Sequence, residues 1–376
     1  MIPFNKPYFT GKETTYIEQA VKSGKISGDG TFTKKCQSFF EKEYGFKKAL
    51  LTTSCTDALE MAAILINISP GDEVIVPSYT FVSTANAFVL RGATIVLVDS
   101  NPLNPNMDCT KIEELITNRT KAIVPVHYAG IACDMDVIMQ IAAKYNLWVI
   151  EDAAQGIESF YNGRQLGTIG HLAAFSFHET KNITSGEGGM LAINDEEFIE
   201  RAEIIWEKGT NRAKFLRGEV DKYTWVDIGS SFLPSDINAA ILYAQIENID
   251  LIQHRRLSVW KRYHERLWPL ISSGDIQLLE INEFATNNGQ MFGIICKSTI
   301  QRKNLIEFLR NSGVQSVFHY VSLHSSPYFI ERGVNKDFAN SDRYSDCLLR
   351  LPMFFELTNK DIDFITSLLF QYFSAV

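Results

Sequence analysis

The sequence predicts an α/β fold, in which a large domain with a mainly parallel seven-stranded sheet precedes a small α+β domain. Between about residues 45 and 195, short β-rich segments alternate with helical patterns, which is typical of α/β domains. Several of the β-rich segments are apolar throughout, as expected for strands that helices cover on both faces. After residue 235 the alternation gives way to a long helical stretch.

The expected strands of the large sheet lie at residues 49–53, 73–77, 94–99, 122–127, 148–152, 173–177 and 190–193. Helices are expected between them, at residues 56–65, 84–91 and 136–145. Ligands of parallel sheets collect at the carboxyl ends of the strands. Asp152 and Ser176 stand at or near such ends, so we expect a ligand site there.

The C-terminal part is expected to form a separate domain. The helical stretch at residues 235–271 contains the predicted boundary, near residue 245, which gives domains 1–245 and 246–376. Further elements are expected as a strand at residues 290–296, a helix at 302–312 and a C-terminal helix from about Asn359.

Composition excludes several classes of protein. The 376 residues are 45% hydrophobic and 21% charged, which is ordinary for a globular protein, and the net charge of −8 argues against nucleic acid as the main partner. No run of 18 apolar residues indicates a membrane span, and the N-terminus lacks the layout of a signal peptide. The six scattered cysteines form no CxxC pair and the histidines show no metal spacing, so we expect reduced thiols in a cytoplasmic protein without a metal site.

Lys181 is the first candidate for chemistry. It lies between a strand-like segment and the glycine-rich run 185–189, where an amine has room to react with an aldehyde. Such a lysine can form the Schiff base of a pyridoxal phosphate enzyme. The alternative is a solvated surface lysine, as most lysines are.

Asp152 is the second candidate, because a carboxylate after the apolar residues 148–150 should be paired. It could keep the pyridine nitrogen of the cofactor protonated, cap the next helix, or do both. Gln155, three residues on, could donate to the phenolate oxygen of the cofactor or could be exposed in a first helical turn.

A phosphate site is expected where residues 51–57 run from a strand into a helix. The free amides at a helix N-terminus and the helix dipole favour an anion there, so Cys55 and Thr56 are the candidate donors. Plain helix capping by Ser54 or Thr56 is the alternative. Ser176 would add a hydroxyl from the strand before Lys181. The sequence has no nucleotide P-loop motif.

Aromatic residues and histidines complete the candidates. Phe81 could stack on a pyridine ring or pack in the core. His319 and His324 flank Tyr320 in an expected loop of the small domain, where they could contact substrate. A structural histidine with satisfied hydrogen bonds is the alternative for each.

These segments together resemble the DegT/DnrJ/EryC1/StrS family of sugar aminotransferases, which have the aspartate-aminotransferase (fold type I) architecture. The resemblance spans nearly the whole chain, and its motifs lie at residues 27–30, 77–81, 126–130, 151–155, 175–182 and 186–189. It implies a pyridoxal 5'-phosphate enzyme with Lys181 and Asp152 in catalysis and a homodimer with shared active sites. It further implies cofactor contacts from Cys55, Thr56, Phe81, Asp152, Gln155, Ser176, Lys181 and Ser231, and substrate contacts from Lys25, His319, Tyr320 and His324.

Residues 208–212, 222–225, 227–231 and 317–320 resemble a subset of the family. Those members aminate dTDP-4-dehydro-6-deoxy-D-glucose to dTDP-4-amino-4,6-dideoxy-D-galactose with L-glutamate, for enterobacterial common antigen or O-antigen synthesis. A perosamine-type or 4-amino-arabinose-type aminotransferase, another pyridoxal phosphate reaction and a non-catalytic sensor are the alternatives.

Three positions distinguish this chain from some members of the family that it resembles. Many members have Gly-x-Asn followed by Tyr-Arg-Met, whereas this chain has Ser231 at the Asn position and Leu233 at the Arg position. In the family that Asn reaches the cofactor phosphate of the partner subunit, and a serine could also donate a hydrogen bond. Dehydratase members have a histidine at the position of Lys181, so its presence favours transamination.

Overall fold

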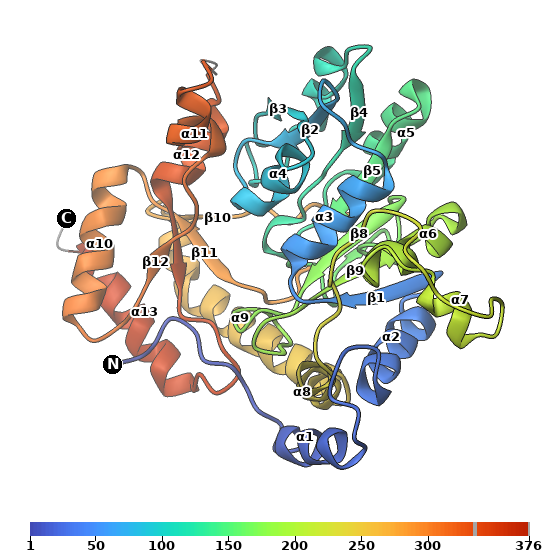
Figure 1. The fold of residues 1–376 in the computed structure, drawn as a ribbon. Coiled ribbons are helices and arrows are strands. Elements are labelled where there is room, and N and C mark those ends of the chain that lie inside the picture. Colours follow the sequence, from blue (N-terminus) through green and yellow to red (C-terminus); the bar gives the residue numbers. More distant parts are fainter. Residues whose placement is uncertain (334–336, 375–376) are drawn as a thin grey trace.

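A seven-stranded β-sheet, formed by residues 48–193, lies at the centre of the larger part of the molecule (Figure 1). The computed structural model describes residues 1–333 and 337–374. The strand order is β1-β9-β8-β5-β4-β2-β3, and β9 alone runs antiparallel to its neighbours within the described residues. The strands are β1 (Lys48–Thr52), β2 (Glu73–Pro77), β3 (Thr94–Val98), β4 (Thr120–Ile123), β5 (Trp148–Asp152), β8 (Leu172–Ser176) and β9 (Gly189–Ile193). The predicted α/β fold with a mainly parallel sheet is confirmed.

Helices cover both faces of this sheet. Neighbouring residues of each strand point to opposite faces, so each strand contributes side chains to both helix-covered cores. In β8, Leu172 and Ala174 pack in a core with helices α3 (Cys55–Leu65), α4 (Val82–Val89) and α6 (Ile199–Trp206). Ala173 and Phe175 pack on the other face with α2 (Thr31–Glu43) and α8 (Asp236–Ile246). Helix α5 (Met135–Tyr145) covers the β4–β5 part of the sheet. Fully apolar strands are therefore buried on both sides, as their sequence indicates.

A second, four-stranded antiparallel sheet forms from the C-terminal part, with the order β10-β11-β13-β12. Its strands are β10 (Gln277–Leu278), β11 (Phe292–Ile295), β12 (Val317–Phe318) and β13 (Leu348–Leu351). One face packs against α9 (Ile249–Ser272), α10 (Thr299–Asn311) and α13 (Asn359–Ser374). The other elements are α1 (Glu13–Lys22), α7 (Arg212–Leu216), α11 (Pro327–Ile330), α12 (Ala339–Cys347) and the hairpin β6 (Phe160–Tyr161) and β7 (Arg164–Gln165).

Several predicted boundaries are wrong, for identifiable reasons. Strand β4 ends at Ile123, four residues before the predicted end, because Pro125 has no N–H to donate to a ladder; Val126 nevertheless forms a parallel bridge with Asp152. The helical stretch at 235–271 is two helices, α8 and α9, separated at residues 247–248. Helix α10 begins three residues before its predicted start, where the Ser298 hydroxyl accepts from the amide of Gln301.

The domain boundary near residue 245 stays a prediction. Helix α8 ends at Ile246 and α9 begins at Ile249. The N-terminus nevertheless pairs with the C-terminal part, since Ile2 forms a parallel bridge with Val314 and the Phe4 carbonyl accepts from the Met353 amide. Among the described residues, no helix has both the length and the apolar character that crossing a membrane requires.

Candidate active site

A cavity of about 380 Å³ opens at the carboxyl ends of β5 and β8. It brings together most of the residues that the sequence predicts for a cofactor. The lining residues that were predicted are Cys55, Thr56, Phe81, Asp152, Gln155, Ser176, Lys181 and Tyr320. This is the edge of the sheet at which parallel strands place their ligands. The roles of these residues in binding stay predictions.

Lys181 follows β8 and lies in the turn before the glycine-rich loop that leads into β9. Burial lowers the pKa of its amine. The nearby Cys55 and Asp152 act in the opposite direction, whereas the positive charge of Arg350 lowers the pKa further. A lysine with a lowered pKa is a better nucleophile toward an aldehyde at neutral pH, because more of it is unprotonated.

Asp152 ends β5, and its carboxylate is held in one orientation. Its Oδ2 accepts from the hydroxyl of Thr84 (2.7 Å) and its Oδ1 accepts from the amide of Ala154 (3.1 Å). Burial raises the pKa of Asp152, although these two hydrogen bonds and the charge of Lys181 oppose that effect. A fixed, buried carboxylate would pair strongly with a protonated ring nitrogen.

Gln155 is buried, with 6% of its surface exposed, and its amide has a defined orientation. Its Oε1 accepts from the amide of Ala129 (2.7 Å), so its Nε2 is available to donate toward the cavity and lies 3.5 Å from the hydroxyl of Tyr320. Ser176 is also buried and accepts a long hydrogen bond from the amide of His178 (3.4 Å). Its hydroxyl proton can therefore point into the cavity.

The N-terminus of α3 forms one end of the cavity, where an anion is expected. Ser54 is the N-cap, since its hydroxyl accepts from the Asp57 amide (3.1 Å), and this leaves the first-turn amides of Cys55 and Thr56 without intrahelical partners. The Thr56 hydroxyl lies 2.7 Å from that of Ser83. Capping by Ser54 and anion binding at the same helix end are thus compatible.

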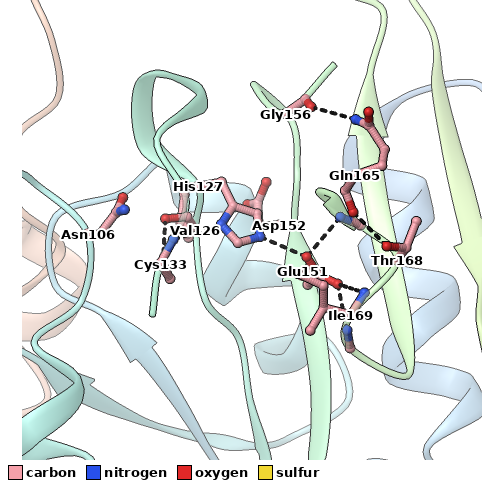
Figure 2. A network of polar contacts seen from close by, with 12 residues as sticks. Asn106, Val126, His127, Cys133, Glu151, Asp152, Gly156, Gln165, Thr168 and Ile169 are labelled. Atoms are coloured by element: carbon pink, nitrogen blue, oxygen red, sulfur yellow. Dashed lines mark hydrogen bonds and ion pairs between the residues drawn. The ribbon is translucent and has the colours of Figure 1, made fainter. Parts of the chain in front are cut away.

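Glu151 and His127 form a buried polar network beside Asp152 (Figure 2). His127 Nδ1 accepts from the Cys133 amide (3.1 Å), so the ring proton is on Nε2, which donates to Glu151 Oε2 (2.9 Å). Glu151 also accepts from three amides of the turn before β8, those of Gly167 (2.8 Å), Ile169 (2.7 Å) and Gly170 (2.6 Å). The backbone of His127 donates to the carbonyl of Asp152. The network therefore ties together the segments that position Asp152 and Ser176.

Phe81 and Tyr320 approach the cavity from different parts of the chain. Phe81 is 53% exposed and lines the cavity, so it is available for stacking and does not pack in the core. Tyr320 has a positive φ of 65° and its ring centroid lies 5.8 Å from that of Phe81. A non-glycine residue in this conformation is uncommon and is held here by the packing around it.

Four predicted contact residues do not line this cavity: Lys25, Ser231, His319 and His324. Ser231 is exposed on the segment after α7. His319 binds the hydroxyl of Tyr128 behind Tyr320. His324 is buried, with Ser78 at its Nδ1 (2.6 Å) and Asp342 at its Nε2 (3.0 Å), so both ring nitrogens already have partners.

Sequence reasoning did not single out Ser83 and Thr84, which contact Thr56 and Asp152. Ser83 and Thr84 lie two and three residues after the predicted aromatic Phe81, in the first turn of a helix, and that position was an available signal. Their contacts join residues 27 and 68 positions apart in the sequence, which no local pattern records.

The residues present fit pyridoxal phosphate. The cavity has an amine of lowered pKa, a fixed carboxylate for a ring nitrogen, an amide donor from Gln155 and a helix N-terminus for phosphate. Gly189 fits the same arrangement: a Cβ atom there would lie 2.3 Å from the carbonyl carbon of Ser54 and 2.4 Å from the nitrogen of Cys55. The glycine-rich loop can therefore pack directly against the helix N-terminus.

Comparisons with known proteins agree with this geometry. The model of the DegT/DnrJ/EryC1/StrS aminotransferase family matches residues 7–370. GDP-perosamine synthase of Caulobacter vibrioides is 34% identical over 372 residues, which covers 97% of this chain and 96% of that protein. The spore coat polysaccharide biosynthesis protein SpsC of Bacillus subtilis is 31% identical, covering 96% of this chain and 94% of that protein.

Solved structures show the same fold. The aminotransferase from Psychrobacter cryohalolentis superposes with a TM-score of 0.93 at 25% identity and covers 100% of both chains. NtdA from Bacillus subtilis, solved with bound pyridoxamine phosphate, superposes with a TM-score of 0.87 at 27% identity, covering 99% of this chain and 86% of that one.

Proposed function

As a member of the DegT/DnrJ/EryC1/StrS aminotransferase family, this chain is a pyridoxal-phosphate-dependent sugar aminotransferase, and we propose that it aminates a 4-keto nucleotide sugar with L-glutamate. The specific proposal is the conversion of dTDP-4-dehydro-6-deoxy-D-glucose to dTDP-4-amino-4,6-dideoxy-D-galactose for a bacterial surface polysaccharide. The observation that most supports transamination is that Lys181, Asp152 and the α3 N-terminus line one cavity.

The bound cofactor supplies an aldehyde that bonds covalently to an amine and a ring that accepts electrons. Lys181 would hold the cofactor through its amine, and the free Nζ would take the proton from the donor α-carbon. Asp152 would hold the proton on the ring nitrogen, and Gln155 Nε2 would orient the ring by donating to its oxygen. The amides of Cys55 and Thr56 and the hydroxyl of Thr56 bind the phosphate.

A second sugar has specific support, since GDP-perosamine synthase is among the relatives. A perosamine-type or 4-amino-arabinose-type reaction would use the same residues and differ only in contacts to the nucleotide and sugar. A non-catalytic sensor is disfavoured, because a sensor would need neither a lysine of lowered pKa nor a fixed partner for the ring nitrogen.

We further propose a homodimer with shared active sites that acts in the cytoplasm. Ser231 and Lys25 lie outside the cavity of their own chain, which leaves them available to a partner's site. The six cysteines are free, as is typical of proteins in a reducing compartment.

Purified protein loaded with pyridoxal phosphate tests the reaction. Lys181→Ala should abolish turnover, whereas Lys303→Ala, at an exposed lysine of α10, should keep it. Turnover of a panel of dTDP-, UDP- and GDP-linked 4-keto sugars, with NMR of the product at C4, identifies the substrate. Wild-type turnover by Lys181→Ala would refute the catalytic assignment, and preference for a GDP-linked sugar would favour the perosamine-type reaction.

A further inference from the structure

Thr84 is a buried threonine whose hydroxyl proton is directed at Asp152. It is the third residue of α4, and none of its surface is exposed. Its Oγ1 donates to Oδ2 of Asp152 at 2.7 Å. A threonine in a helix commonly donates instead to a backbone carbonyl one turn earlier. The hydroxyl of Thr84 therefore serves the end of β5 and not its own helix.

A second hydroxyl lies behind that of Thr84. Thr80 is also buried, and its Oγ1 lies 2.9 Å from Oγ1 of Thr84. An ionised carboxylate can only accept, so the single hydroxyl proton of Thr84 lies toward Asp152 and that of Thr80 lies toward Thr84. The two hydroxyls thus form a directed chain that ends at Asp152, in which each hydrogen bond polarises the next.

Thr84 is the only side chain that donates a hydrogen bond to the Asp152 carboxylate within the described residues. The other donor is the backbone amide of Ala154, which any residue at that position except proline would supply. A carboxylate has about four acceptor positions, and two donors leave the others free. Because Asp152 lines the cavity and Thr84 does not, Thr84 acts on a ligand there through Asp152.

Burial raises the pKa of Asp152, and the hydrogen bond from Thr84 is the first of the effects that oppose burial. The ionisable groups that act on this carboxyl come from several elements around the cavity. They are Lys181 after β8, His127 after β4, Cys55 at the start of α3 and Tyr320 after β12. Thr84 thus favours the ionised carboxyl in a place where burial favours the neutral one.

We propose that Thr84 is a positioning residue that keeps the proton between Asp152 and the cofactor on the ring nitrogen instead of on the carboxylate. This inference rests on the proposed role of Asp152. A hydroxyl donates more strongly to an ionised carboxylate than to a protonated one, so it favours the arrangement with the charged carboxylate. Without Thr84, Asp152 should hold the proton more of the time. Lys181 should then remove the α-carbon proton more slowly, because a neutral ring accepts electrons less readily.

The test compares Thr84→Val, which has a similar shape without the hydroxyl, with Thr84→Ser, which keeps the hydroxyl. The protein is loaded with pyridoxal phosphate that carries 15N in its ring, and the 15N chemical shift reports how much of the ring nitrogen is protonated. Thr84→Val should lower the ratio of protonated to neutral ring nitrogen by about 10-fold. Thr84→Ser should remain near the wild type.

Thr33→Val is the matched control. Thr33 is also the third residue of a helix, α2, and is also fully buried. Its Oγ1 donates at 2.8 Å to Oδ1 of a buried aspartate, Asp236. The same chemical change there should lower stability and leave the 15N shift of the cofactor unchanged. An equal change of the 15N shift in both variants would reduce the effect of Thr84 to general destabilisation and overturn the proposal.

A kinetic measurement gives a second readout. The loaded protein is mixed with L-glutamate without sugar, and the cofactor absorbance is followed in a stopped-flow instrument. Thr84→Val should lower the limiting rate by up to about 10-fold, with a larger isotope effect for glutamate deuterated at the α-carbon. The half-saturating glutamate concentration should change little, because Thr84 does not line the cavity.

The NMR outcomes separate this inference from the proposed role of Asp152. Asp152→Asn should shift the 15N signal further toward neutral nitrogen than Thr84→Val does. A shift in Asp152→Asn together with a wild-type signal in Thr84→Val overturns the inference for Thr84 alone. A wild-type signal in Asp152→Asn refutes the role of Asp152, and the inference with it. If Thr84→Val does not fold, Thr84→Ala replaces it, and a wild-type signal there is equally contrary.

Discussion

Glu151 and Asp152 are consecutive residues of β5 with opposite electrostatic surroundings. Burial raises the pKa of Asp152, which accepts from one hydroxyl and one amide. Burial alone would also raise the pKa of Glu151, but His127 and the amides of the turn before β8 outweigh it, and the pKa is lowered. The number of donors that face each carboxylate decides the difference.

Glu151→Gln should destabilise the protein, because the glutamine NH2 group cannot accept and would face N–H donors at one of the two carboxylate positions. The loss should be at least about 1–3 kcal/mol for each amide left unpaired. Urea unfolding of Glu151→Gln at neutral pH measures it, with the exposed Glu265→Gln as the control. Equal midpoints for the two variants would show that the network does not contribute to stability.

The lowered pKa of Glu151 should make the stability of the folded protein depend on pH. A carboxyl whose pKa is lowered on folding stabilises the folded state above its unfolded pKa and loses this contribution as the pH falls through its folded pKa. Wild-type stability should therefore decrease as the pH falls below the ordinary carboxyl value of 4.5, and Glu151→Gln should lack this part of the decrease. Equal decreases of stability at low pH in the wild type and in Glu151→Gln would contradict this role of Glu151.

At the scale of elements, the phosphate site depends on how the loop before β9 meets the N-terminus of α3. Gly189 begins β9, and any side chain there would collide with the backbone at Ser54 and Cys55. The close approach leaves no room for a Cβ atom, so glycine is required at this position. Local sequence shows a glycine-rich run but does not show which glycine contacts the helix.

Gly189→Ala should move the N-terminus of α3 and weaken both stability and cofactor binding. Overpacking of this kind costs about 1–3 kcal/mol. Titration of the cofactor-free protein with pyridoxal phosphate measures the affinity, and Gly293→Ala in β11, where the nearest atom to an added Cβ is 3.7 Å away, is the control. Unchanged affinity in Gly189→Ala would show that phosphate binding does not depend on the close approach of Gly189 to the α3 N-terminus.

At the scale of the whole molecule, the segment around residues 223–228 exposes large apolar side chains. Trp225 is 78% exposed, and Tyr223, Val226 and Ile228 beside it are exposed as well. A patch of this kind indicates a protein–protein interface. The segment leads directly into Ser231, which the family resemblance assigns to a partner's site.

Sedimentation velocity should show a homodimer, and Trp225→Asp should shift it toward monomer with a parallel loss of turnover. Placing a charge in an apolar interface disfavours association, because the charge loses its hydration there. Trp268→Asp, at a tryptophan of α9 that is 55% exposed, is the control and should remain dimeric. A wild-type monomer with full activity would contradict the shared site.

The sequence by itself determined the fold class and the two central residues of the candidate site. Alternating strand and helix patterns are local, and the strand-end position of Asp152 and the loop position of Lys181 follow from neighbours in the chain. The interruption of β4 after Ile123 was also readable from Pro125, although Val126 pairs again with Asp152.

Only the tertiary structure decided which polar groups remain free to bind a ligand. Ala129 orients the amide of Gln155, whereas Ser78 and Asp342 occupy both ring nitrogens of His324. Arg350 is an ordinary charged residue in the sequence, but in the fold it is buried and its Nε makes no hydrogen bond within residues 1–333 and 337–374. The physical reason is that a side chain's availability depends on partners that long-range packing brings to it from distant positions in the chain.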